Sequence, residues 1–321
     1  MKKNNNIKTS SGFVALIGAT NSGKSTLINT LVGKKVSIVT QKVQTTRNRI
    51  RGIIQEKNCQ IILVDTPGIF FPKKKIERAM VKSAWNESDV SDETILVVDS
   101  SKKEIDINLL KIIKNFKNKK KNVSLILNKI DLIEKKLIVD RIKNFSILYD
   151  FKKIFLISAK YGYGIDDLKK WLGSQLPKGP FLFEKGTISD FPDHKLAAEI
   201  MREKIFLNIH QELPYQITVL VESWDVSDKK LIKCNITIYV SKISYKGMII
   251  GKNGMTLKRI ATATRKELEE NLNKKIYIKT FVKYKKDLME KQSTFEEIGL
   301  DFNAYMVRHW NFTIFETIWR K

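Results

Sequence analysis

Short apolar runs recur along the first half of the chain, and each is followed by a polar or glycine-containing segment. The runs cover residues 13–17, 61–64, 123–127 and 154–157. Apolar runs of this length, bounded by turn residues, are typical of the buried strands of a parallel sheet. Residues 25–31 and 165–175 have the pattern of helices. The first half therefore predicts an α/β fold whose polar segments meet at the carboxyl ends of the strands.

The second half of the chain has a different pattern. Helical spacing of apolar residues is found in 193–210 and 257–272, and strand-like runs are found in 216–222, 232–240 and 275–282. With a further helical segment within 246–255, ahead of 257–272, the resulting order is α-β-β-α-α-β. A stretch with two prolines at 176–180 indicates a domain boundary, and a length of 321 residues suggests two domains. The expected divisions are a basic tail 1–11, a first domain 12–178, a linker 179–192, a second domain 193–300 and an apolar extension 301–321.

A phosphate-binding loop is predicted directly after the first apolar run. Residues 18–25 read Gly-Ala-Thr-Asn-Ser-Gly-Lys-Ser, in which two glycines flank four residues and precede Lys-Ser. In such a loop the backbone N–H groups and the start of the next helix face an anion. Lys24 would reach the β- and γ-phosphates, and the Ser25 hydroxyl would bind Mg²⁺. The expected nucleotide contacts are Gly18, Ala19, Thr20, Asn21, Ser22, Gly23, Lys24 and Ser25.

The base is predicted to be guanine. Residues 128–131 read Asn-Lys-Ile-Asp after the third apolar run, which is the guanine-reading motif of Ras-like GTPases. Asp131 would accept hydrogen bonds from guanine N1–H and its exocyclic amine; adenine has an acceptor at N1 and no amine at that edge. Two bonds to a charged group, at about 1.5–3 kcal/mol each, discriminate by on the order of a hundredfold or more. The Lys129 stem would lie along the base, and Asn128 would tie this loop to the phosphate loop. The guanine carbonyl is expected to contact the backbone of Ser158, Ala159 and Lys160.

Two further segments are predicted to sense the γ-phosphate. Asp65, Thr66, Pro67 and Gly68 end the second apolar run, where Asp65 would hold Mg²⁺ indirectly and the Gly68 N–H would contact the γ-phosphate. Asp-Thr-Pro-Gly is also a good turn sequence, so this segment taken alone fits a simple turn equally well. Thr46 would complete the Mg²⁺ ligands, and we prefer it to Thr45 because it directly precedes an arginine. The predicted catalytic residues are Lys24, Thr46 and Gly68.

Intrinsic hydrolysis is expected to be slow. Ras-type proteins place a glutamine after Asp-x-x-Gly to orient the attacking water, and Ile69 occupies that position here. In potassium-activated relatives an asparagine at the position of Asn21 helps to hold K⁺ beside the phosphates. Asn21 is therefore a candidate K⁺ ligand, and a role only in shaping the loop is the alternative.

A nucleic-acid clamp is predicted in the second domain. Residues 251–254 read Gly-Lys-Asn-Gly between two helical segments, the Gly-x-x-Gly pattern of KH domains. The expected RNA contacts are Lys246, Gly251, Lys252, Asn253, Gly254 and Lys258. The net charge of +25 also favours a polyanionic partner, although abundant lysine can reflect a compositional bias of the genome.

Taken together, these motifs resemble the Era family of bacterial GTPases from about residue 12 to residue 300. The resemblance rests on residues 18–25, 44–47, 65–68, 128–131, 158–160, 212–215 and 246–254. It implies a Ras-like P-loop GTPase domain with a mostly parallel sheet, followed by an α+β type II KH domain. It also implies hydrolysis of GTP to GDP, binding near the 3′ end of small-subunit ribosomal RNA, and assistance in maturation of the 30S subunit. Asn253 departs from the glycine common at its position, but asparagine tolerates a left-handed backbone.

Location and alternative functions complete the sequence-based expectations. We expect a cytoplasmic monomer, and the resemblance implies peripheral association with the inner face of the cell membrane. The extension 301–321 either packs on the KH domain, anchors the protein at a membrane interface or is a disordered or lineage-specific addition. The alternative function is a membrane-associated signalling GTPase whose C-terminal region binds protein or lipid. A tRNA-modifying GTPase is disfavoured because no cysteine or cofactor motif is found elsewhere.

Overall fold

The protein was analysed as a computed structural model that describes residues 9–40, 49–72, 74–209, 216–286, 288, 291–297 and 299–302. The described residues form two compact units, one of residues 9–36 and 49–190 and one of residues 37–40 and 191–302. The elements are β1 (Ser10–Ile17), α1 (Lys24–Val32), β2 (Ile50–Glu56), β3 (Cys59–Asp65), α2 (Lys75–Val90), β4 (Glu93–Asp99), α3 (Ile107–Lys119), β5 (Ser124–Asn128), η1 (Ile130–Leu132), α4 (Lys135–Leu148), β6 (Ile154–Ile157), α5 (Ile165–Gln175), α6 (Asp193–Asn208), β7 (Ile217–Asp225), β8 (Leu231–Val240), α7 (Ile243–Ile250), η2 (Lys252–Gly254), α8 (Met255–Leu272), β9 (Lys275–Tyr284) and α9 (Gln292–Glu297).

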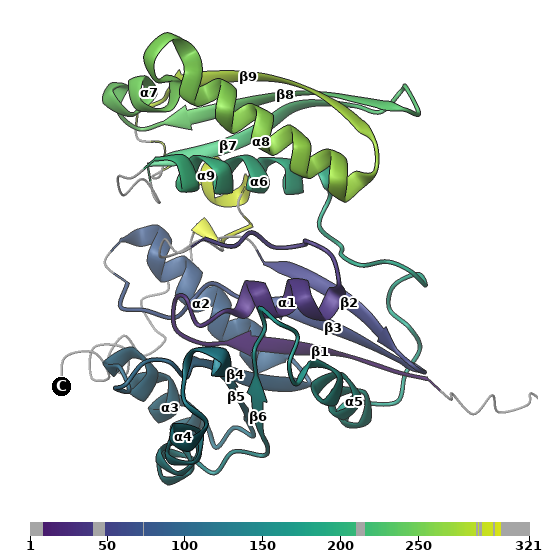
Figure 1. The fold of residues 1–321 in the computed structure, drawn as a ribbon, viewed down its shortest axis with the longest axis vertical. Coiled ribbons are helices and arrows are strands. Elements are labelled where there is room, and N and C mark those ends of the chain that lie inside the picture. The colour runs from purple at the N-terminus through teal and green to yellow at the C-terminus, as the bar shows by residue number, and fades with distance from the viewer. Residues whose placement is uncertain are drawn as a thin grey trace, which may run out of the picture. The chain divides into compact units, whose positions relative to one another are not determined.

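The first unit is built on a sheet with the strand order β2-β3-β1-β4-β5-β6. Only β2 runs antiparallel to its neighbour, and the other pairings are parallel. Helices α2, α3 and α4 pack over one face through a buried apolar cluster, while α1 and α5 lie against β2 and β3 (Figure 1). Because both faces are covered, the strands are nearly continuous apolar runs. The expected mostly parallel α/β domain is confirmed.

Strand order also explains where the site lies. The four apolar runs predicted as strands are β1, β3, β5 and β6, and the predicted helices 25–31 and 165–175 are α1 and α5. Strand β1 lies between β3 and β4, so the connections that follow β1 and β3 leave toward opposite sides. Ligands of open α/β sheets bind at such a switch point, outside the carboxyl ends of the strands. All four polar motifs are therefore brought to one edge of the sheet.

The second unit has the predicted order α-β-β-α-α-β in α6, β7, β8, α7, α8 and β9. In its sheet β7 pairs antiparallel with β8, and β8 pairs parallel with β9. The even-numbered residues of β8, from Ile232 to Val240, belong to one apolar core with α6 and α8. Helices α6 and α8 lie along the sheet of β7, β8 and β9 (Figure 1). This mixed sheet with helices on one face is the expected KH fold.

One segment from early in the chain belongs to the second unit. Ile38 is fully buried in the apolar core that α6, β7, β8, α8 and β9 form. The backbone N–H of Val39 donates to Oε1 of Glu203, on α6, at 2.8 Å. Residues 37–40, which precede Thr46 in the chain, therefore belong to the KH unit. The sequence analysis did not reveal this, because the three apolar residues Val36, Ile38 and Val39 form a run too short to be assigned to a helix or a strand.

Two of the segments expected from the sequence, at the two ends of the chain, lie largely outside the described residues. Apart from Asp301 and Phe302, the extension 301–321 lies outside the described residues, as does most of the basic tail 1–11. Within the described part of the chain, no helix has the length and apolar character that crossing a bilayer demands.

Candidate functional site

The phosphate loop has the backbone geometry that its glycines predict. It leaves β1 at Gly18 and enters α1 after Gly23, whose φ is +95°. A Cβ at Gly23 would lie 2.2 Å from the Asn128 side-chain nitrogen. Glycine is thus required at this position for two reasons: the backbone is left-handed, and the side chain of Asn128 comes too close to leave room for a Cβ. Asn21 also has a positive φ of 62°, which asparagine tolerates better than most residues.

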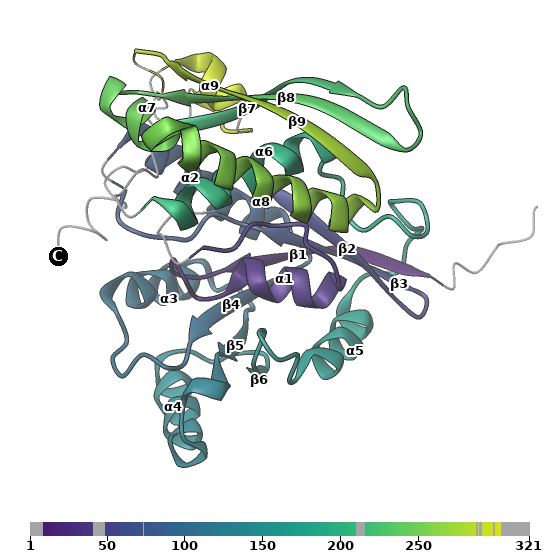
Figure 2. The same ribbon diagram turned by 45° about the horizontal axis from the view of Figure 1, so that its top comes forward.

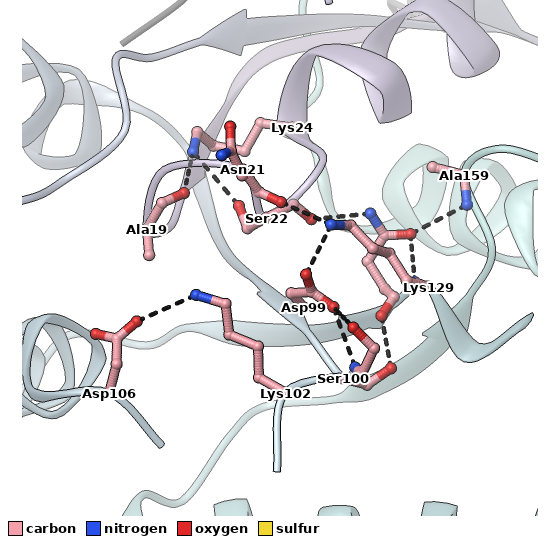
Figure 3. Close-up of polar contacts among 12 residues, drawn as sticks. Ala19, Asn21, Ser22, Lys24, Asp99, Ser100, Lys102, Asp106, Lys129 and Ala159 are labelled. Atoms are coloured by element: carbon pink, nitrogen blue, oxygen red, sulfur yellow. Dashed lines mark hydrogen bonds and ion pairs between the residues drawn. The ribbon is translucent and has the colours of Figure 1, made fainter. Parts of the chain in front are cut away.

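Lys24 lies inside the loop that it is predicted to serve. Its Nζ donates to the Gly18 carbonyl oxygen at 3.0 Å. It also donates to the Ala19 carbonyl oxygen at 2.9 Å (Figure 3). The side chain is buried, and burial lowers the pKa of Lys24 to about 8 although the Asp65 carboxylate acts in the opposite direction. A cation held at low solvent exposure attracts an anion strongly, because it loses little hydration when the anion arrives. This position suits an ammonium that neutralises phosphate oxygens.

Ser25 and Asp65 form the candidate Mg²⁺ site. The Ser25 hydroxyl donates to Oδ2 of Asp65 at 2.8 Å, so the start of α1 and the end of β3 place the expected Mg²⁺ ligand beside the carboxylate that would hold the ion indirectly. Thr66 fixes the chain just beyond, because its hydroxyl donates to the Leu16 carbonyl at 2.7 Å. Hard oxygen donors next to a phosphate loop are the donor set that Mg²⁺ prefers. The residues present therefore fit the ion.

Asn128 joins three loops through one buried amide. Its side-chain N–H donates to the Ser22 carbonyl at 2.9 Å, as the sequence predicted. Its side-chain oxygen accepts from the backbone N–H of Lys129 at 2.8 Å and of Ala159 at 3.0 Å. The phosphate loop and both base-reading loops are therefore held in one arrangement.

The base-reading carboxylate has its own support. The Ser158 hydroxyl donates a hydrogen bond to Oδ1 of Asp131, which orients the carboxylate. The Thr30 hydroxyl donates to the Ala159 carbonyl at 2.7 Å and ties this loop to α1. Asp131 is exposed, so its oxygens are accessible to a ligand. Lys160 is also exposed, and its Nζ lies 4.9 Å from the ring centre of Tyr161.

The residues expected to sense the γ-phosphate are described in part. Thr46 lies outside the described residues. Gly68 lies against the phosphate loop, since a Cβ on it would come within 3.0 Å of the Thr20 backbone. Ile69 is buried in the apolar cluster under the sheet, and its N–H donates to the Gly18 carbonyl at 3.0 Å. Its side chain thus has no access to a water molecule at the phosphates.

In the second unit, the Gly-x-x-Gly loop connects α7 to α8. Gly251 has φ +71°, and a Cβ there would lie 2.2 Å from the Thr256 hydroxyl oxygen. Asn253 and Gly254 have φ of 52° and 74°, so the asparagine takes the left-handed conformation anticipated for it. Exposed lysines flank the loop at Lys246, Lys252 and Lys258. The loop therefore leaves its backbone open to a nucleic-acid strand.

Comparison with known proteins identifies the family. A family model described as a 50S ribosome-binding GTPase matches residues 13–129, and a KH domain model matches residues 212–288. GTPase Era of Dinoroseobacter shibae is 42% identical over 296 residues, which are 92% of this chain and 96% of that protein. The chain belongs to the Era family of GTPases. GTPase Era of Bradyrhizobium diazoefficiens is 43% identical over 92% of this chain and 95% of its own length.

Solved Era structures agree with this assignment. A crystal structure of Era in complex with MgGDPNP and nucleotides 1506–1542 of 16S ribosomal RNA superposes with a TM-score of 0.85 at 34% identity. The superposition covers 91% of this chain and 99% of the solved Era chain. An Aquifex aeolicus Era variant bound to GDP·AlF4⁻ matches equally well. This Era-family protein is thus a GTPase, which hydrolyses GTP to GDP and phosphate.

One residue of the Era-family site was missed by the sequence analysis. Asp99 ends β4, and its Oδ2 accepts from Lys129 Nζ at 2.6 Å (Figure 3). Burial acts to raise the pKa of Asp99, but hydrogen bonds from Lys129 and Ser101 outweigh it and the pKa lies below its ordinary value. Lys129 Nζ also donates to the Asn21 carbonyl at 2.9 Å. Asp99 therefore holds the lysine across the site, where its stem can lie along a base.

Proposed function

We propose that the protein is a GTP-driven switch that binds small-subunit ribosomal RNA near its 3′ end and assists maturation of the 30S subunit. The observation that carries the proposal is the open Gly-x-x-Gly loop in the same chain as a complete guanine site. The solved Era with a bound 16S fragment supports the choice of RNA. The alternative, a membrane-associated signalling GTPase, is not favoured, because the family relationship extends over the KH domain as well as the GTPase domain.

The chain's own residues bind and orient GTP. Asp131, aligned by Ser158, selects guanine, while the phosphate-loop N–H groups and the start of α1 hold the β- and γ-phosphates. The Lys24 ammonium neutralises charge that develops on the oxygen between them when water displaces it from the γ-phosphorus. Ser25, Asp65 and Thr46 would hold Mg²⁺, which supplies further charge neutralisation when bound. Without a water-orienting glutamine, turnover is slow unless a partner or an ion assists.

The bound nucleotide affects the KH unit through the stretch of chain that connects Ile38 to Thr46. Thr46 would bind only while the γ-phosphate is present, and this ordering ends with hydrolysis. Eight residues earlier in the chain, Ile38 is buried in the core of the KH unit. Ordering at Thr46 therefore restrains a segment whose other end is fixed beside α6. This connection supports a switch in which GTP changes how the clamp is presented to RNA.

Potassium is a further candidate cofactor. Asn21 lies at the outer turn of the phosphate loop, with a backbone carbonyl already directed at Lys129. A K⁺ held there would place positive charge where an arginine finger acts in other GTPases. We expect faster turnover in KCl than in NaCl, and a loss of the difference in Asn21→Ala. Equal rates in the two salts leave Asn21 with a loop-shaping role only.

Binding of RNA is tested with clamp variants of the full-length chain. Gly251→Asp and Gly254→Asp place a carboxylate where phosphates would lie, so affinity for an RNA matching the 3′ end of 16S ribosomal RNA should fall at least about tenfold. GDP affinity should not change. Gly186→Asp is the matched control, because Gly186, like Gly254, has a positive φ and open space around its Cβ position. Unchanged RNA affinity in the clamp variants contradicts the proposal and favours a protein or lipid partner.

The location of the protein stays a prediction in part. The family trait of peripheral membrane association leads us to expect that a fraction of the protein floats with vesicles of inner-membrane lipids. The measurement is flotation with and without residues 303–321, since this apolar segment is the candidate anchor. Recovery only in the unbound fraction in both cases would remove the membrane from the proposal.

A further inference from the structure

Strand β9 carries an unusual solvent face. Its odd-numbered residues point away from the core of the KH unit, and lysine alternates there with aromatic residues. The intervening Ile276, Ile278 and Val282 pack into the core. We call this set the β9 face: Lys275, Tyr277, Lys279, Phe281 and Lys283.

Neighbouring residues extend the same chemistry. In the parallel register of β8 and β9, Lys233 lies opposite Tyr277, and Tyr239 lies opposite Lys283. Lys285 Nζ lies 5.3 Å from the ring centre of Tyr239. Within the β9 face, Lys279 Nζ lies 5.5 Å from the ring centre of Phe281. Cations and aromatic rings are thus interleaved across two strands.

Protection of a sheet edge explains only part of this pattern. Among the described strands β9 is at the edge of its sheet, and lysines on an edge strand hinder pairing with other chains. The aromatic residues have the opposite effect, because they add apolar surface that favours association. Tyr277 is 58% exposed and Phe281 is 40% exposed, so neither is stabilised by full burial. Their placement calls for a ligand with flat apolar groups and negative charge.

We propose that the β9 face binds single-stranded RNA, as a continuation of the path that begins at the Gly-x-x-Gly loop. The inference rests on the proposed function. Successive bases stack on aromatic side chains, and lysines track the phosphates. Tyr277 and Phe281 are four residues apart, which at the rise of a strand is about 13 Å and leaves room for intervening nucleotides. Carboxylates on this side of the sheet lie on the far strand β7, at Glu222 and Asp225.

Continuity with the clamp follows from the position of β9. The clamp loop joins α7 to α8, and both helices contact β9 (Figure 2). Because both helices pack against the core side of β9 and β9 is an edge strand of its sheet as described, RNA that leaves the clamp reaches the β9 face by passing round the β9 edge. A KH clamp holds about four nucleotides, so a longer RNA should gain affinity from this second surface.

The test compares labelled, unstructured RNA oligonucleotides of about four and about ten nucleotides on the full-length chain by fluorescence anisotropy. Tyr277→Ser/Phe281→Ser should weaken binding of the longer RNA at least about tenfold and change binding of the shorter one less than about twofold. Tyr277→Phe/Phe281→Tyr keeps both rings and should retain wild-type affinity. Ile147→Ser controls for loss of exposed apolar surface, since Ile147 is 82% exposed on α4 of the GTPase unit.

Charge gives a second readout. In Lys275→Gln/Lys279→Gln/Lys283→Gln, the slope of log affinity against log salt for the longer RNA should fall by about 2, because each phosphate contact to a single strand contributes about 0.7. An unchanged slope, or aromatic variants that bind the longer RNA as wild type does, overturns the inference. So does an altered sedimentation coefficient with unaltered RNA affinity, which would assign the face to a second copy of the chain. Failure of the proposed function is distinct, because then Gly251→Asp would leave binding of the shorter RNA unchanged.

Discussion

Replacing Asn128 with alanine should weaken GDP binding about a hundredfold. The amide is only 1% exposed, and it makes three hydrogen bonds that join the phosphate loop to both base-reading loops. Alanine removes all three. The loops then have to be ordered by the nucleotide itself, and the cost of ordering them is subtracted from the binding free energy.

The magnitude follows from the number of bonds. A net contribution of about 0.5–1.5 kcal/mol for each bond gives a total of about 1.5–4.5 kcal/mol. The middle of that range, about 3 kcal/mol, corresponds to about two powers of ten in the dissociation constant. Thr30→Val removes the hydroxyl that contacts the Ala159 carbonyl at 2.7 Å and the Thr26 carbonyl at 2.9 Å. Because a hydroxyl has one hydrogen to donate, the loss should cost about 1 kcal/mol, or about fivefold.

Asn128→Asp distinguishes the bonds from one another. A carboxylate can still accept from Lys129 N–H and Ala159 N–H. It also puts a charged oxygen in the place of the Asn128 side-chain nitrogen, which lies 2.9 Å from the Ser22 carbonyl oxygen. A buried charge facing an acceptor is costly, so the aspartate variant should bind GDP more weakly than the alanine variant.

Isothermal titration calorimetry with GDP measures these affinities, and thermal unfolding of the free protein checks that each variant is folded. The expected order of affinity is wild type, Thr30→Val, Asn128→Ala, Asn128→Asp. If Asn128→Ala binds GDP within about threefold of wild type, the bonds contribute less than about 0.7 kcal/mol in total and the reasoning is wrong.

Three other predictions follow from the structure. Asp131→Asn should shift preference from guanosine to xanthosine diphosphate in competition binding, because xanthine offers an acceptor where guanine has an amine; no shift would contradict guanine selection by Asp131. The pKa of Lys24 is about 8 in the folded protein without nucleotide and 10.5 in the unfolded chain, so between these pH values the unfolded state binds more protons and Lys24 makes the free energy of unfolding rise with pH. Chemical denaturation at several pH values should show a smaller rise in Lys24→Met. Equal pH profiles for the variant and the wild type would refute the assignment. Ile38→Ala should lower the unfolding free energy of the KH unit by about 2–4 kcal/mol through the lost apolar contact and the cavity, measured by hydrogen exchange of β8; unchanged exchange would place Ile38 outside that core.

The sequence specified the strands that carry phosphate and base motifs, because each of these strands couples an apolar run to a short segment with its own chemistry. β1, β3, β5 and β6 were all found in this way. The KH order was equally accessible, because helical and strand periodicities alternate clearly from residue 193 onward. In each case the deciding signal was local, within about ten residues of the element concerned.

The role of Asp99 could not be predicted from the residues next to it in the sequence. β4 is as apolar as its neighbours, but the residues after it, Ser100 to Lys103, have no motif that names a ligand. The role of Asp99 exists only because β4 and β5 are adjacent and parallel, which sets Asp99 opposite Asn128 in register and next to Lys129. A topological argument could have found it. A parallel sheet with motifs on both sides of a central strand needs a strand between residues 65 and 123, and its last residue must lie at the same edge.

Ile38 is a different case, because no rule of strand order places it. Residues 37–40 follow a helix of the GTPase unit, and yet Ile38 is buried with residues more than 150 positions later in the chain, such as Ile200. A nucleotide switch that acts on a separate domain needs a segment that both parts restrain. The segment from Ile38 to Thr46 satisfies that need if the γ-phosphate binds Thr46, because Ile38 belongs to the core of the KH unit and Thr46 follows it by eight residues. GDP and a non-hydrolysable GTP analogue should then give different hydrogen exchange at Val39. That difference should vanish in Thr46→Ala, and its persistence there would show that the signal travels by another route.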